Sequence, residues 1–141
     1  MAALLSQHVW DMQPCAWCVL QRLIFVALAL AAGLGLVLPG ALGSRIGAAL
    51  ALVLAGLGLA TALWHHFVAS SSASCNLTLA DRVMGATGLD SLLPQVFAAY
   101  ASCADARVDL AGMPYEFWSG ALFTLLGMMA LWALRMLRRP A

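Results

Sequence analysis

Three long runs of the sequence carry no charged residue, and they constrain the fold more than any other feature. The runs cover residues 23–38, 46–64 and 117–134. A bilayer core about 30 Å thick is crossed by about 20 helical residues, so each run is long enough once flanking residues are added. Helices of a soluble bundle would each show a polar stripe, and these runs show none. The runs therefore predict transmembrane helices.

The predicted architecture is an all-α transmembrane helix bundle that forms a single domain over residues 1–141. We place the three spans at about 19–38, 46–66 and 117–135. A long loop at about 68–116 joins the second span to the third. The second span is rich in small residues that would allow close contact between helices, among them Ala51, Ala55, Gly56 and Gly58.

The overall composition agrees with a lipid environment. Of the 141 residues, 64% are apolar and 9% are charged, whereas an ordinary soluble domain is about 45–50% apolar. So few charges do not cover the surface of a soluble domain of this size. The formal net charge of +1 also argues against a nucleic-acid-binding protein, which needs a basic face against the phosphates.

The remaining charges predict the orientation of the chain. One side of the membrane would carry arginines only, namely Arg45, Arg135, Arg138 and Arg139. The opposite side would carry all the acidic residues, namely Asp11, Asp81, Asp90, Asp105, Asp109 and Glu116, together with Arg82 and Arg107. By the positive-inside rule, the predicted turn at 39–45 and the C-terminus are expected in the cytoplasm. The long loop and the N-terminal residues are then expected outside.

All four cysteines lie on the predicted outer side, which suggests disulfide chemistry. Cys15 and Cys18 form a C-x-x-C motif just before the first span, and Cys75 and Cys103 lie in the long loop. Four cysteines allow three pairings, and adjacency favours Cys15 with Cys18. A C-x-x-C pair closes too short a loop to stabilise a fold much, so such pairs are more often redox-active or metal-binding.

Arg22 and two histidines are the further candidates near the C-x-x-C motif. Arg22 follows Cys18 by four residues, so on a helix it lies on the same face one turn deeper in the membrane. A cation at that depth is a functional candidate, because it would stabilise a neighbouring thiolate or hydrogen-bond a lipid-soluble electron acceptor. His65 and His66 end the second span, about level with the cysteines, and the sequence does not distinguish between them.

Two segments resemble the disulfide bond formation protein B (DsbB) family. PCAWCVLQR at 14–22 is similar to that family's C-x-x-C-x-x-x-R signature, and LLPQVFAAYASCADARVDLAGMPYEFW at 92–118 is similar to its second outer loop and the entry to its last span. The resemblance covers most of residues 7–135 and includes both cysteine pairs. It implies a multi-pass protein of the bacterial inner membrane, with the cysteines facing the periplasm.

The resemblance also implies a reaction. A DsbA-like periplasmic protein of thioredoxin fold would pass electrons to a Cys75–Cys103 disulfide and then to a Cys15–Cys18 disulfide. The reduced Cys18 would pass them to a membrane quinone, either ubiquinone or menaquinone. Arg22 would stabilise the anionic species there, and His65 or His66 would be a quinone neighbour or a proton donor. No metal is among the cofactors that the resemblance implies.

One departure from the family and two rival functions from classes other than redox enzymes remain at this point. Members of the family have four spans, and only 14 residues precede Cys15 here, so we expect that the true start lies upstream and that most of the first helix is missing. A metal-binding or metal-transport membrane protein would use Cys15, Cys18, His65 and His66 as ligands. A structural subunit would use the Cys75–Cys103 pair only as a staple.

Overall fold

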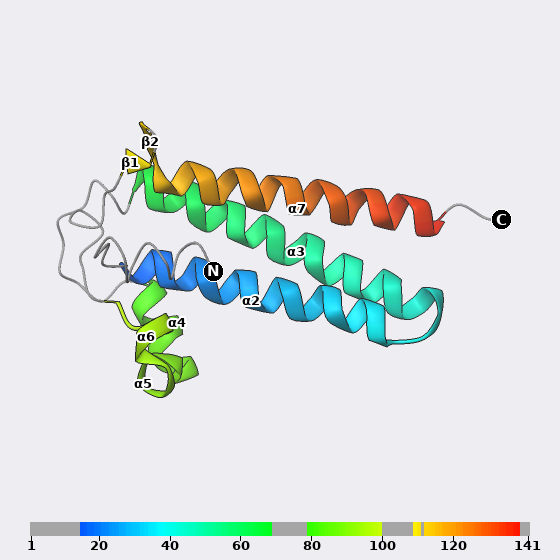
Figure 1. Cartoon of the computed structure of the whole chain (residues 1–141), viewed down its shortest axis with the longest axis horizontal. Helices are drawn as coiled ribbons and strands as arrows, with labels where there is room; N and C mark the ends of the chain where they lie inside the picture. Colours follow the sequence, from blue (N-terminus) through cyan, green and yellow to red (C-terminus); the bar gives the residue numbers. More distant parts are fainter. Residues whose placement is uncertain (1–14, 69–78, 100–108, 111, 139–141) are drawn as a thin grey trace.

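The computed structural model describes residues 15–68, 79–99, 109–110 and 112–138, and three long helices dominate it. They are α2 (Ala16–Val37), α3 (Gly40–Phe67) and α7 (Tyr115–Arg138). All three are long and apolar enough to cross a membrane. Helix α3 lies between α2 and α7 and runs antiparallel to both (Figure 1). The expected all-α membrane bundle with three spans is thus confirmed.

The reversal between α2 and α3 is shorter than the predicted turn at 39–45. Leu38 and Pro39 are extended, Gly40 adopts a φ of 88°, and α3 begins at Gly40. A positive φ is accessible to glycine because it has no Cβ, so one residue can redirect the chain into the next helix. Arg45, expected in the turn, lies instead on α3, where its guanidinium donates a hydrogen bond of 2.6 Å to the carbonyl oxygen of Leu137.

Small residues hold α3 close to both neighbours. A Cβ added to Gly47 would lie 2.5 Å from the Cα of Gly35 on α2, so the two backbones touch at this point. A Cβ added to Gly58 would overlap the ring of Phe123 on α7. That ring stacks on Phe25 of α2 with the centroids 4.0 Å apart. One aromatic pair therefore links all three helices at the centre of the bundle.

Among the small residues named from the sequence, Ala51, Ala55 and Gly58 are buried, whereas Gly56 is exposed. Ala51 and Ala55 belong to the central apolar cluster with Leu28, Phe123 and Ala130. The outer faces of the helices are apolar as well. Leu30, Val53 and Trp132 expose 65%, 61% and 63% of their surface, respectively. An apolar surface of this kind is stable against lipid rather than water.

The segment between α3 and α7 contains further regular structure where it is described. Helix α4 (Leu79–Thr87) is followed by α5 (Leu89–Leu92) and α6 (Pro94–Phe97). Two short antiparallel strands, β1 (Asp109–Leu110) and β2 (Met113–Pro114), lead into α7. The three short helices lie beside the N-terminal end of α2 (Figure 1).

The packing of the short helices on α2 is apolar. Ala80 of α4 packs with Trp17 and Leu20 of α2 and with Cys15, which precedes that helix. Val19 of α2 packs with Met84 of α4 and Phe97 of α6. Proline is well placed at the first position of a helix, which accounts for the start of α6 at Pro94. These contacts fix the surroundings of the C-x-x-C motif.

Candidate functional site

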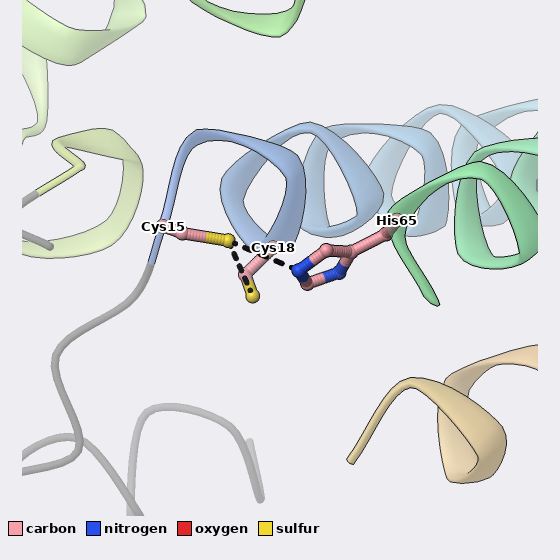
Figure 2. A group of neighbouring side chains, drawn as sticks. All are labelled: Cys15, Cys18 and His65. Carbon is pink, nitrogen blue, oxygen red and sulfur yellow. Dashed lines mark hydrogen bonds between the residues drawn. The ribbon is translucent and has the colours of Figure 1, made fainter. Parts of the chain in front are cut away.

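Cys15 and Cys18 lie together at the N-terminal end of α2 (Figure 2). Cys15 is the residue before the helix and Cys18 is in its first turn, so their side chains meet at a separation of three residues. The two Sγ atoms are 3.1 Å apart and no disulfide joins them, so the structure represents the dithiol form of the pair. Cys15 is fully buried, and Cys18 is half-buried.

The position of the pair on the helix has an electrostatic consequence. The first backbone N–H groups of a helix point out of its N-terminal end, and the helix dipole places partial positive charge there. Both effects favour negative charge at this end of the helix. Neither requires a side chain, because both come from the 22-residue helix that begins at Ala16.

His65 is the histidine that lies next to the dithiol. It occupies the last turn of α3, and its Nε2 atom is 3.5 Å from the Sγ atom of Cys15 (Figure 2). The His65 side chain is buried, with 2% of its surface exposed. Because α2 and α3 are antiparallel, the end of α3 and the beginning of α2 meet at the same level of the bundle. The structure thus joins the C-x-x-C motif to one of the two candidate histidines.

His66 lies in different surroundings. Its ring contacts the rings of Phe67 and Phe117 edge-on, with centroids 4.9 and 4.6 Å away, respectively. It also lines an apolar cavity of about 250 Å³ between α3 and α7. The other lining residues are Leu59, Ala62, Leu63, Glu116, Phe117, Gly120 and Ala121. The two neighbouring histidines therefore have different surroundings: His65 lies beside the dithiol and His66 lies beside the cavity.

Glu116 is a member of the site that the sequence did not single out. It lies in the first turn of α7, is buried, and places its Oε1 atom 3.8 Å from Nε2 of His65. A signal was present in the sequence, because an ionisable residue at the entry to an apolar span is a functional candidate. The sequence could not show that the start of α7 lies next to the end of α3, where His65 is located.

Arg22 is directed toward the short helices. Its Nη1 atom donates a hydrogen bond of 3.0 Å to the carbonyl oxygen of Val96 in α6. The preceding residue, Gln21, is buried and accepts a hydrogen bond through Oε1 from the hydroxyl of Ser119 on α7. Its Nε2 atom has no hydrogen-bond partner among the residues that the structure describes. The turn of α2 below Cys18 thus carries both a guanidinium and a buried amide donor.

The second predicted pair, Cys75 and Cys103, lies outside the described residues. Within the described ranges, the groups able to hold a metal ion are the two sulfurs of Cys15 and Cys18 and the imidazole of His65, whose ligand atoms all lie within 4.8 Å of one another. Among the described residues around Cys18, Trp17 Nε1 and Gln21 Nε2 are buried donors without a hydrogen-bond partner, and the Arg22 guanidinium donates to Val96.

Comparison with known proteins gives a single family. The model of the family "Disulfide bond formation protein DsbB" matches residues 1–133. Disulfide bond formation protein B of Aromatoleum aromaticum is 34% identical over 129 residues, which cover 89% of this chain and 77% of that protein. The protein of the same name from Herminiimonas arsenicoxydans is 31% identical, over 92% of this chain and 82% of that protein.

A third relative of that name, from Polaromonas naphthalenivorans, is 29% identical over 94% of this chain and 81% of its own length. No solved structure matches the chain. The family model covers nearly all of α2, α3 and α7, including the C-x-x-C motif. The chain belongs to the DsbB family of disulfide bond formation proteins.

Proposed function

We propose that this protein is a thiol–disulfide oxidoreductase of the bacterial inner membrane that reoxidises a DsbA-like periplasmic protein and passes the electrons to a membrane quinone. The observation that carries the proposal is the Cys15–Cys18 dithiol at the end of a membrane-spanning helix, beside the buried His65. A redox pair at that level lies between the lipid-soluble acceptor and the groups outside the membrane, and its half-buried sulfur is that of Cys18. Family membership supports the same chemistry.

The proposed electron path uses both cysteine pairs. A thiolate of the partner attacks the Cys75–Cys103 disulfide at Cys75, forms a mixed disulfide and releases the Cys103 thiolate. The second thiol of the partner resolves the mixed disulfide, so the partner leaves oxidised and the loop pair is reduced. Exchange of Cys103 with Cys15 then transfers two electrons to the Cys15–Cys18 pair, which becomes the dithiol. Each step exchanges one S–S bond for another.

Reoxidation of the dithiol requires removal of two electrons and two protons, which a quinone accepts. Cys18 is the sulfur that we expect to face the acceptor, because it is half-buried whereas Cys15 is fully buried. Gln21 and Arg22, one turn deeper on α2, would donate hydrogen bonds to the acceptor's oxygen. The buried amide nitrogen of Gln21, unpartnered among the described residues, fits such a role.

His65 and Glu116 are proposed to carry the protons. His65 Nε2, at 3.5 Å from Cys15 Sγ, is close enough to accept the thiol proton as the sulfur becomes a thiolate. Glu116 Oε1, at 3.8 Å from the same nitrogen, stabilises the resulting imidazolium. General bases placed in this way typically accelerate a step by about 10²–10⁴-fold.

The decisive experiment compares quinone reduction by reduced DsbA in membranes that contain the unaltered protein or Cys18→Ser. The variant should reduce quinone at the rate of membranes without the protein, because serine forms neither the disulfide nor the thiolate. Gly56→Ala, which adds a methyl group in open space, serves as the control for expression and should retain the full rate. Equal rates for the unaltered protein and Cys18→Ser would refute the proposal.

A further inference from the structure

Two sulfurs and an imidazole nitrogen converge where α2 begins and α3 ends. Cys15 Sγ is 3.1 Å from Cys18 Sγ and 3.5 Å from His65 Nε2, and all three atoms lie within 4.8 Å of one another. Figure 2 shows the three side chains pointing toward one another from the two helices. Thiolate and imidazole are ligands that Zn²⁺ and other soft or borderline cations prefer.

The spacing of the donors is close to that of a tetrahedral site. Zinc bonds of about 2.3 Å to sulfur and 2.0–2.1 Å to nitrogen place two ligand sulfurs about 3.8 Å apart, and a sulfur and a nitrogen about 3.5 Å apart. The Cys15–His65 separation of 3.5 Å already has the length required. The two sulfurs, at 3.1 Å, need to separate by about 0.7 Å. Cys18 is half-buried and its Sγ atom lies within 4.8 Å of His65 Nε2, so rotation of the Cys18 side chain is the adjustment that the site requires.

Charge and burial also suit a divalent cation. Two thiolates and a neutral imidazole balance a charge of +2, so the complex carries no net charge in a region of low dielectric constant. Cys15 and His65 are buried, with 0% and 2% of their surfaces exposed. A water molecule as the fourth ligand would keep the complex neutral, with the Glu116 carboxylate remaining 3.8 Å from His65 Nε2.

We propose that the reduced Cys15–Cys18 pair and His65 form a binding site for a soft divalent cation such as Zn²⁺. Binding is not a redox step, because each thiol releases one proton and the cation forms two metal–sulfur bonds. In the oxidised protein the same two sulfurs are bonded to each other and offer no thiolate. Metal and disulfide therefore exclude each other, and a bound cation holds the pair in its reduced form.

This site does not depend on the proposed electron acceptor or on the proposed partner. It requires only the dithiol and His65, so a failure of the quinone or DsbA assay leaves it unaffected. It also differs from metal transport, because the donors close around a single ion at one end of the bundle. The expected consequence is inhibition, in which the cation occupies the dithiol that the redox cycle needs.

The test uses the full chain with Cys75→Ser and Cys103→Ser, which leaves Cys15 and Cys18 as its only thiols. Co²⁺ is the probe, because it gives thiolate charge-transfer bands and d–d bands typical of a tetrahedral site. The reduced protein should bind one Co²⁺ per chain, and added Zn²⁺ should displace it. The oxidised protein should give neither set of bands. Reduced protein without thiolate bands, or equal bands in both forms, would overturn the proposal.

Substitution of the histidines tests the third ligand. His65→Ala should weaken Co²⁺ binding about tenfold or more, whereas His66→Ala should leave it unchanged, because His66 lies against Phe67 and Phe117. Equal affinities of the two variants would contradict a role for His65. Circular dichroism verifies that each variant retains its helices, and the comparison of reduced with oxidised protein decides the matter even where a histidine variant does not fold.

Discussion

His65 and His66 are adjacent in the sequence, yet it is His65 whose Nε2 atom lies 3.5 Å from the sulfur of Cys15. Successive residues of a helix point about 100° apart, so one of two neighbouring histidines faces α2 and the other faces α7. His65 lies 3.5 Å from Cys15, and His66 lines the cavity beside Phe117. The sequence placed both at the correct level, and the rotation of α3 about its axis determined which one joins the site.

The first prediction at this scale concerns those two histidines. His65→Ala should lower the rate of quinone reduction by reduced DsbA by about 10²-fold, since it removes the proposed proton acceptor of Cys15. His66→Ala should stay within about threefold of the unaltered protein, because His66 packs against Phe67 and Phe117 and lines the cavity between α3 and α7. The initial rate of quinone reduction at saturating quinone is measured for each of the two variants. A larger effect of His66→Ala than of His65→Ala would contradict the assignment.

At the scale of elements, the bundle depends on positions where two helices approach more closely than ordinary side chains permit. Gly35 and Gly47 bring α2 and α3 into backbone contact, and Gly58 admits the ring of Phe123 from α7. The sequence suggested that small residues would serve this purpose. It could not separate Gly58 from the exposed Gly56, because that distinction depends on the direction of each Cα relative to α7.

Gly58→Ala should therefore destabilise the bundle by about 1–3 kcal/mol, the usual penalty for forcing extra volume into a packed core. The added methyl would overlap the Phe123 ring and disturb its stacking on Phe25. Gly56→Ala is the matched control, because a Cβ there meets nothing within 4 Å. Unfolding of the two variants is measured in mixed micelles with a rising fraction of denaturing detergent. The same detergent fraction at the unfolding midpoint of both variants would contradict the contact between Gly58 and Phe123.

The contact between α2 and α6 provides a second prediction at this scale. Arg22→Met removes the hydrogen bond to the carbonyl oxygen of Val96, and it should weaken the docking of α6 by about 1–2 kcal/mol. Exchange of the backbone amides of Val96, Phe97 and Ala98, which are hydrogen-bonded in this turn, should then become roughly ten times faster, while exchange in α3 stays unchanged. Arg82→Met, an exposed position on α4, is the control. Unchanged exchange in Arg22→Met would show that Arg22 does not hold α6.

At the scale of the whole molecule, the C-x-x-C motif, the end of α3, the start of α7 and the short helices α4 to α6 gather at one end of the bundle (Figure 1). The α2–α3 turn and the end of α7 lie at the opposite end. This arrangement separates the chemistry from the arginines near the C-terminus. By the positive-inside rule, the end of the bundle that carries these arginines is expected on the cytoplasmic side of the membrane.

The orientation follows as a prediction. With the cysteines facing the periplasm, alkaline phosphatase fused after Asp90 should be active, because that enzyme requires periplasmic disulfide formation. The same enzyme fused at the C-terminus should be inactive, and a green fluorescent protein at that position should fluoresce, because the C-terminus is expected in the cytoplasm. The opposite pattern in the three fusions would contradict the proposed orientation.

The sequence alone determined the membrane environment, the three spans and the candidate dithiol, because these depend on local composition and on residues near one another in the chain. It overestimated the turn at 39–45, since it could not show that Gly40 reverses the chain by itself. The tertiary structure decided the contact of His65 with Cys15, the position of Glu116 beside His65, and the hydrogen bond from Arg22 to α6. These depend on how antiparallel helices rotate and align against one another, which is fixed by packing at such positions as Gly47, Gly58 and Phe123.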